Sequence, residues 1–166
     1  MLTSSQLAAL RTAILNDPVL AVIPQTPDGA FTVAEAFNVV AAPDFWVWRT
    51  AVSRSDIYNS VSADATNWNW TTYKNQGVAE QNAWTQMFMG DQANFAQDNV
   101  RAGIAAIFTG SAQATAQRDH CLAVGRRKSS RAEKLFATGT GTSGSPAKMT
   151  FEGSLTYQDV LNAWAT

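Results

Sequence analysis

The pattern of hydrophobic and polar positions predicts a mainly helical chain, and it is clearest near the N-terminus. Apolar side chains recur there on one helical face, at Leu7, Leu10 and Ile14. Thr3 precedes Gln6 by three residues and forms a capping box with it, while Asn16-Asp17-Pro18 ends the periodic run. The first element is therefore predicted to be an amphipathic helix of about 12 residues.

Similar start signals recur further along the chain. N-cap residues or capping boxes predict helices that begin near Thr32, Ser53, Asn94 and Thr156. A helical pattern runs from Gln76 to Met89, and the longest predicted helix runs from about Ala114 to Thr138 despite Gly125 inside it. Three prolines between residues 18 and 29 limit that segment to turns or short extended pieces.

Two aromatic segments do not follow the helical pattern. Phe45-Trp46-Val47-Trp48 is apolar on both faces and fits a buried strand or the start of a buried helix. From Ala65 to Lys74, Trp68 and Trp70 alternate with asparagines, which predicts a short β-hairpin or an ordered extended loop. Because these two tryptophans lie in a polar context, both are candidates for contact with a partner protein.

Composition changes abruptly near the C-terminus. The stretch from Thr138 to Pro146 contains no apolar side chain. The chain is therefore predicted to have a helical body over residues 1–137, a flexible Gly/Ser/Thr linker over 138–148 and a C-terminal docking arm over 149–166. The predicted fold class is mainly α, a helical bundle with the short β-hairpin or extended loop and an extended C-terminal arm.

The predicted arm is rich in large apolar residues: Phe151, Leu155, Tyr157, Val160, Leu161 and Trp164. It is too short to fold alone and too apolar to remain in water, so it has to pack against protein. That protein is either the body of the same chain or a neighbouring subunit. We favour the neighbouring subunit, and these six residues are candidate partner-binding residues.

Charge is sparse and unevenly placed. Charged residues make up 15% of the chain, against about 25% in a typical soluble domain, and the net charge is −1. Little charge repulsion therefore opposes self-association, which favours a subunit of a larger assembly. No stretch has the length of a membrane span or the form of a secretory leader, so we expect a soluble protein made in the cytoplasm, with no membrane partner.

Basic residues concentrate between Arg118 and Lys134. This segment contains six of the chain's twelve lysines and arginines. On a continuous helix, Arg127, Arg131 and Lys134 would share one face and would be able to bind phosphates or an acidic partner surface. The alternative is a solvated helix face whose side-chain stems cover apolar neighbours. The near-neutral chain as a whole is not typical of a dedicated nucleic-acid binder.

No residue set in the sequence suits catalysis or metal binding. His120 and Cys121 are adjacent, and adjacent helical positions point in different directions, so they are not expected to form a dyad. We expect a buried Cys121 and a His120 that faces solvent or lies at the edge of the core. One histidine and one cysteine are too few for a zinc site, and the acidic residues are scattered. The sequence therefore predicts no catalytic residue, cofactor or metal, and a protein that is not an enzyme.

Four stretches resemble a family of small proteins encoded among the virion genes of tailed bacteriophages. They are Asp28-Gly-Ala-Phe, Ala42-Pro-Asp-Phe-Trp-Val-Trp-Arg-Thr50, Arg131-Ala-Glu-Lys-Leu-Phe-Ala-Thr-Gly-Thr-Gly141 and Met149-Thr-Phe-Glu-Gly-Ser-Leu-Thr-Tyr-Gln-Asp-Val160. The resemblance spans nearly the whole chain. Within this family we favour a head–tail adaptor, also called a connector or neck protein, because such adaptors have a similar architecture of a small helical body with a C-terminal segment.

The resemblance implies a ring of about twelve identical subunits, in keeping with the closed symmetry of most homo-oligomers. Such a ring docks onto the portal protein, contacts a tail or nozzle protein and joins capsid to tail, with C-terminal segments that reach onto the portal or a neighbour. The basic segment would face DNA in the channel or an acidic surface of the portal, and we favour the portal. Alternatives are a capsid decoration protein, a minor tail protein and a DNA-binding packaging accessory protein.

Overall fold

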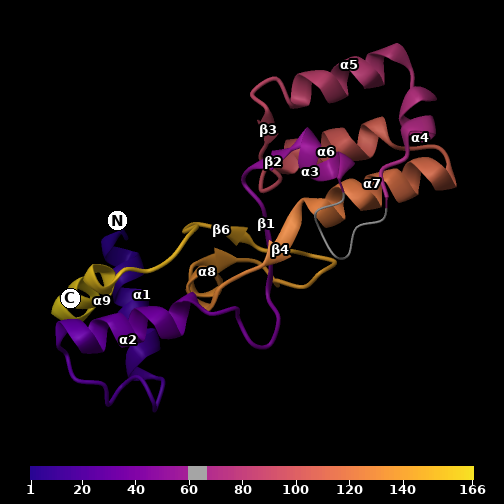
Figure 1. The fold of residues 1–166 in the computed structure, drawn as a ribbon. Helices are drawn as coiled ribbons and strands as arrows, with labels where there is room; N and C mark the ends of the chain where they lie inside the picture. The colour runs from indigo at the N-terminus through magenta and orange to yellow at the C-terminus, as the bar shows by residue number, and fades with distance from the viewer. Residues whose placement is uncertain (60–66) are drawn as a thin grey trace. The chain divides into compact units, whose positions relative to one another are not determined.

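The chain folds as two units in the computed structural model, which describes residues 1–59 and 67–166. Unit 1 contains Met1–Val47 and Lys128–Thr166, and unit 2 contains Trp48–Arg127. The two ends of the chain therefore belong to the same unit (Figure 1), and the middle of the sequence forms the other. This division differs from the predicted body, linker and arm.

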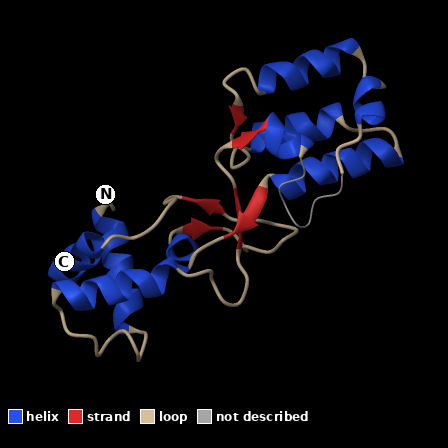
Figure 2. Ribbon diagram, in the orientation of Figure 1, coloured by secondary structure: helices blue, strands red, loops and turns tan. Residues whose placement is uncertain are grey.

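Helices account for most of the regular structure, as predicted (Figure 2). Unit 1 holds the elements α1 (Ser4–Leu15), α2 (Pro27–Asn38), α8 (Arg131–Leu135), β5 (Ala137–Thr138), β6 (Lys148–Met149) and α9 (Tyr157–Ala165). Unit 2 holds β2 (Val52–Ser53), α3 (Arg54–Tyr58), α4 (Trp70–Lys74), α5 (Val78–Met87), β3 (Gln92–Ala93), α6 (Asp98–Ile107) and α7 (Ala112–Val124). The chain passes from one unit to the other within β1 (Trp46–Trp48) and β4 (Arg126–Lys128).

The first two helices begin at capping residues. Thr3 caps α1 in a complete capping box with Gln6, as predicted. Helix α2 begins earlier than predicted, because Thr26 is its N-cap and Pro27 takes the first helical position, where a missing N–H is tolerated. The side chain of Thr32, expected to be the cap, donates instead to the Asp28 carbonyl inside the helix at 3.0 Å.

The C-terminal helix completes the core of unit 1. Helix α9 packs against α1 and α2, and its Val160 and Ala163 are fully buried with Leu10, Val33 and Phe37. The capping box of Thr156 and Asp159 starts α9 as predicted. The extended docking arm predicted for residues 149–166 is therefore wrong for this chain: its apolar face closes the core of its own unit.

The predicted flexible linker is a closed hairpin. Strands β5 and β6 pair antiparallel, with Ala137 opposite Met149 and Thr138 opposite Lys148. Within the connecting loop, the Gly141 carbonyl accepts the Trp46 N–H at 2.7 Å. Gly141 has φ +67°, and a side chain there would overlap the ring of Phe45, so glycine is required by conformation and by space. Gly141, one of the glycines that indicated flexibility, thus lets the backbone of the loop pass close to the Phe45 ring.

Unit 2 is built around an aromatic core. Trp84, Phe88, Phe95 and Phe108 are fully buried among α5, α6 and α7. Strands β2 and β3 pair antiparallel beside them, and Ser53 caps α3 in a box with Asp56, as predicted. The prediction that Trp84 is a core residue is confirmed.

The predicted long helix over residues 114–138 is broken at Gly125. Helix α7 ends at Val124, and the chain then forms β4 and the short helix α8. Gly125 is buried, and a Cβ atom there would overlap the Phe95 ring, so the helix ends where this ring packs against the backbone of a glycine. The prediction fails because this approach is made by a residue distant in the sequence.

The two aromatic segments take the following structures. Trp46–Trp48 is strand β1, which settles the choice between strand and helix. The β-hairpin or extended loop predicted for residues 65–74 is wrong from Trp70 onward, where helix α4 forms; its Ala65 and Thr66 lie outside the described residues. Asn69 caps this helix by accepting the Thr72 N–H at 2.9 Å, a local bond that outweighs the alternating pattern.

Candidate functional site

The apolar residues predicted to bind a partner through the C-terminal segment are mostly internal. Leu155 and Val160 are buried in the core of unit 1, and Phe151, Leu161 and Trp164 are partly buried against it. Tyr157, at the start of α9, is 48% exposed. Of these six residues, Tyr157 alone keeps a large accessible surface.

The two tryptophans proposed as partner contacts have different environments. Trp68 is buried and stacks on Trp84 with ring centroids 5.3 Å apart, so it belongs to the core of unit 2. Trp70 is 51% exposed and packs against Tyr58, with centroids 4.8 Å apart. Only Trp70 therefore remains accessible to a partner.

The basic residues do not share one helix face as predicted. Arg127 lies in β4, whereas Arg131 and Lys134 lie one turn apart in α8. The expected face depended on a continuous helix through Gly125, which the structure does not have. Arg131 and Lys134 remain together, and they define the basic part of the candidate site.

Arg131 is held in place by two contacts. Its guanidinium pairs with the Asp17 carboxylate at 2.6 Å and lies 4.6 Å from the centroid of the Phe37 ring. Asp17 also accepts the N–H groups of Val19 and Leu20. The Arg131 hydrogen bond, followed by these backbone bonds, lowers the pKa of Asp17 below its usual range.

Lys134 has an unpaired charge. Its ammonium lies 5.6 Å from the centroid of the Phe45 ring, and no carboxylate of the described residues pairs with it. Lys134 is partly buried, so its stem is covered while its charge remains available.

Arg131 and Lys134 line a groove of about 220 Å³ in unit 1. The other lining residues are apolar and come from α1, the end of α2 with the segment after it, and α8: Ala13, Phe37, Ala41, Ala42 and Leu135. An apolar floor beside two cations suits a partner side chain that is apolar and has a carboxylate nearby. We regard this groove, called the basic groove below, as the principal candidate binding site.

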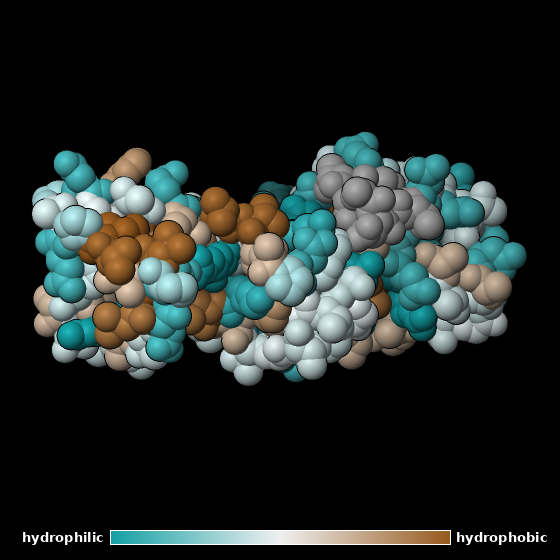
Figure 3. Space-filling view, turned by 90° about the horizontal axis from the view of Figure 1, so that it is seen from below, coloured by the Kyte–Doolittle hydropathy of each residue, from teal (hydrophilic) through white to brown (hydrophobic). Residues whose placement is uncertain are grey.

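Sequence reasoning missed a set of exposed apolar residues in unit 1. Between residues 15 and 40, six large apolar side chains are more than half exposed: Leu15, Val19, Val22, Phe31, Val39 and Val40. Figure 3 shows hydrophobic residues gathered on the surface of the half that carries α1, α2 and α9. The sequence contained one sign of this surface. The valines of the proline-rich segment 18–29 follow neither a helical nor a strand period, so no regular face would turn them toward a core.

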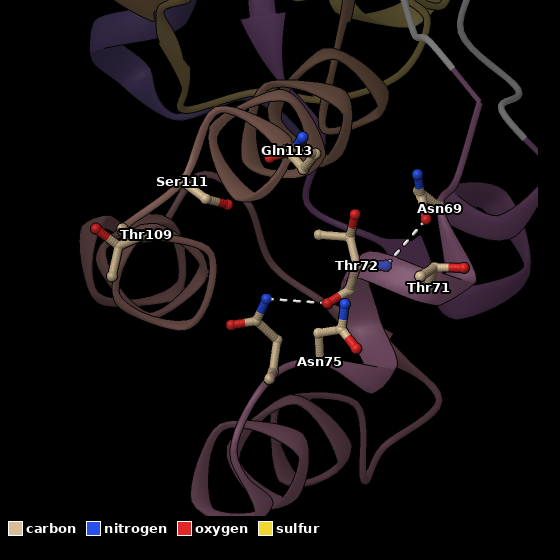
Figure 4. A pocket seen from close by; sticks show the side chains of 9 residues that line it. Asn69, Thr71, Thr72, Asn75, Thr109, Ser111 and Gln113 are labelled. Atoms are coloured by element: carbon tan, nitrogen blue, oxygen red, sulfur yellow. Dashed lines mark hydrogen bonds between the residues drawn. The ribbon is translucent and has the colours of Figure 1, made fainter.

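Unit 2 has a polar cleft of about 500 Å³ between α4 and the segment that leads into α7 (Figure 4). Amides and hydroxyls line it, among them Asn69, Thr72, Gln76 and Ser111. Hydrogen bonds join some residues of the lining: the Asn69 side chain accepts the Thr72 N–H at 2.9 Å, and the Thr72 carbonyl accepts the Gln76 side-chain amide at 3.0 Å. The lining contains no carboxylate, imidazole, thiol or cation, so it offers hydrogen bonds but no acid or base that would activate its hydroxyls.

The histidine and the cysteine are both buried. His120 is 1% exposed, and its Nε2 donates to the Ile57 carbonyl at 2.8 Å, so the expected position at the surface or the edge of the core is wrong. Cys121 is fully buried, as predicted, and desolvation strongly raises the pKa of its thiol. Neither group has the access that nucleophilic or base catalysis requires.

Residues 1–59 and 67–166 hold no cluster of three or more His, Cys, Asp or Glu that could bind a metal ion. Among the same residues, no helix has the length and apolar character needed to cross a membrane.

No protein-family model, curated protein or solved structure matches this chain. The resemblance to phage virion proteins therefore stays a prediction from the sequence.

Proposed function

We propose that this chain is a structural subunit of a tailed-phage particle, in the head–tail adaptor ring that docks onto the portal and joins capsid to tail. The observation that carries the proposal is the exposed apolar surface of unit 1 between Leu15 and Val40. The C-terminal segment does not carry it, because that segment fills the core of its own unit.

Exposed apolar surface of this kind is typical of proteins that work in contact with others. Val19 and Val22 are 70% and 79% exposed and lie in the irregular connection between α1 and α2. Each buried Å² of apolar surface contributes about 25 cal/mol, so covering such side chains with a partner stabilises the complex. The net charge of −1 leaves little repulsion to oppose that contact.

The side chains that line the polar cleft and the basic groove are suited to binding rather than to catalysis. The polar cleft offers neutral hydrogen-bonding groups, and the basic groove offers an apolar floor with two cations. Such groups recognise a partner surface without making or breaking a covalent bond. A structural role is therefore the function that these sites fit best.

A DNA-binding packaging accessory protein is less well supported. Lys128 pairs with Asp44 at 2.7 Å and Arg131 pairs with Asp17, so part of the positive charge of the basic segment is already offset within the chain. A phosphate-binding surface gains affinity from each accessible cation. Weak DNA binding by the purified chain is accordingly expected, and tight, steeply salt-dependent binding would favour the accessory role.

Copy number in purified particles tests the proposal and separates its rivals. Quantitative mass spectrometry should give this chain in a ratio near one to the portal, which is about twelve copies for a ring of that symmetry. On the order of hundreds of copies would instead identify a decoration protein of the shell, in keeping with its symmetry. Absence from the particle would contradict any virion role.

A matched pair of double variants tests whether incorporation into the particle depends on the exposed apolar surface of unit 1. Val19→Ser with Val22→Ser should leave a folded protein that fails to enter particles. Val78→Ser with Met89→Ser removes apolar side chains that are equally exposed in unit 2, and this protein should be incorporated as the wild type is. Equal incorporation of both double variants would show that the unit 1 surface is not the docking surface.

A further inference from the structure

Helix α2 presents an acidic face with an aromatic residue at its centre. Asp28, Phe31 and Glu35 lie at positions i, i+3 and i+7, on one side of the helix. All three are exposed, Phe31 by 60%. Neither carboxylate pairs with a cation of the described residues. An exposed ring between two unpaired carboxylates is therefore available for contact.

The basic groove has the complementary character. Its volume of about 220 Å³ lies below the roughly 300–1,000 Å³ of drug-sized ligand pockets, and is better suited to one large side chain. Lys134 supplies an unpaired ammonium at its edge. Arg131 has five N–H donors and uses few of them on Asp17, and its side chain is 37% exposed. The groove thus fits an apolar side chain flanked by carboxylates.

These two surfaces lie on different sides of α2. Phe31 points away from the core, whereas Phe37 is buried and lines the groove. Six residues of α-helix turn the chain by about 600°, so the two rings point about 120° apart. A copy therefore cannot place its own Phe31 in its own groove, although it can place it in the groove of another copy.

We propose that copies of this chain bind one another head to tail, with Phe31 of one copy in the basic groove of the next and Glu35 paired with Lys134. A contact between two different surfaces repeats from copy to copy, and it generates a closed ring or an open filament. This inference rests on the proposed function and deepens it, because it names the surface between neighbouring subunits.

Sedimentation equilibrium of the full chain at several concentrations and salt strengths tests the contact. The wild type should self-associate, and more weakly as salt screens the charge pair. Lys134→Glu and Glu35→Lys should each raise the dissociation constant by roughly tenfold, and the double charge swap should recover much of that loss. Phe31→Ser should raise it by about thirtyfold, as expected for a central anchor.

Control variants show that the effects are local. Lys74→Glu reverses an exposed charge in unit 2, and Met89→Ser removes an exposed apolar side chain there. Both should associate as the wild type does. Circular dichroism of every variant verifies that the fold is retained.

Three results would each overturn the inference. The first is a wild type that stays monomeric at every soluble concentration. The second is self-association that is unchanged by Lys134→Glu and Phe31→Ser, and the third is a charge swap that restores nothing. None of them bears on the number of copies in the particle, so the proposed function is tested separately.

Discussion

The side-chain amide of Asn38 binds both backbone groups of Leu155. Its Oδ1 accepts the Leu155 N–H at 2.8 Å, and its Nδ2 donates to the Leu155 carbonyl at 3.0 Å. Asn38 is the last residue of α2, and Leu155 lies just before α9. This two-point contact joins segments 117 residues apart and ties the C-terminal helix to its own unit.

Replacing Asn38 by alanine should weaken unit 1. Asn38→Ala removes both hydrogen bonds and leaves two backbone groups of Leu155 unpaired, so the free energy of unfolding should fall by about 2 kcal/mol. Urea denaturation measures this loss. Gln25→Ala, at an exposed amide of the same unit, should change stability by less than about 0.5 kcal/mol. Equal stability of the two variants would show that the Asn38 contact contributes little.

Removing the last helix should unfold unit 1. Truncation after Gly153 deletes Leu155, Val160 and Ala163, which are buried against α1 and α2. The backbone amides of α1 and α2 should then lose their protection against hydrogen exchange, because the apolar faces of these helices become exposed to water. Protection at the wild-type level in those helices would mean that α9 is dispensable, as a docking arm would be.

The Asp17–Arg131 pair should make stability depend on acid pH. The folded-state pKa of Asp17 is lowered by Arg131 and by two backbone N–H groups. Its contribution is therefore complete above the unfolded pKa of about 4 and is lost as pH falls through the lower folded value. The difference in unfolding free energy between wild type and Asp17→Asn should be constant near neutral pH and shrink below about pH 4. A difference that grows on acidification would contradict the pairing.

Cys121 should report the opening of unit 2. Its thiol is buried and its pKa is raised by desolvation, so a maleimide reagent should fail to modify the folded protein at neutral pH. Modification should become complete in denaturant, and the signal is unambiguous because the sequence has one cysteine. Rapid modification of the native protein would show that unit 2 opens readily.

Two glycine substitutions should act in opposite directions. Gly125→Ala places a methyl group against the Phe95 ring and should cost about 1–3 kcal/mol of stability. Gly103→Ala, inside α6, meets only the movable end of Met87 and should stabilise the helix by roughly 0.5–1 kcal/mol. Thermal unfolding of both variants tests the pair. Similar melting temperatures would contradict the close packing at Gly125.

Elements that depend on near neighbours in sequence were predictable. Thr3, Ser53 and Thr156 each start a helix through bonds to a residue three positions later, so the sequence carries the whole signal. The burial of Trp84 and Cys121 also followed from their residue types and spacing.

Features that depend on distant partners were not predictable. The bond from Asn38 to Leu155 and the approach of Phe95 to Gly125 have no local pattern, and they decide where α9 packs and where α7 ends. The basic groove combines α1, α2 and α8, so its lining could not be assembled from spacing alone. Arg131 and Lys134 were identified from their charge, and their apolar neighbours were not.

A reconstruction of the neck of the intact particle tests the central claim most directly. We predict a ring of copies of this chain between portal and tail, with Val19, Val22 and Phe31 covered by another polypeptide. A map that places the chain elsewhere, or leaves those three side chains in open solvent, would contradict the account.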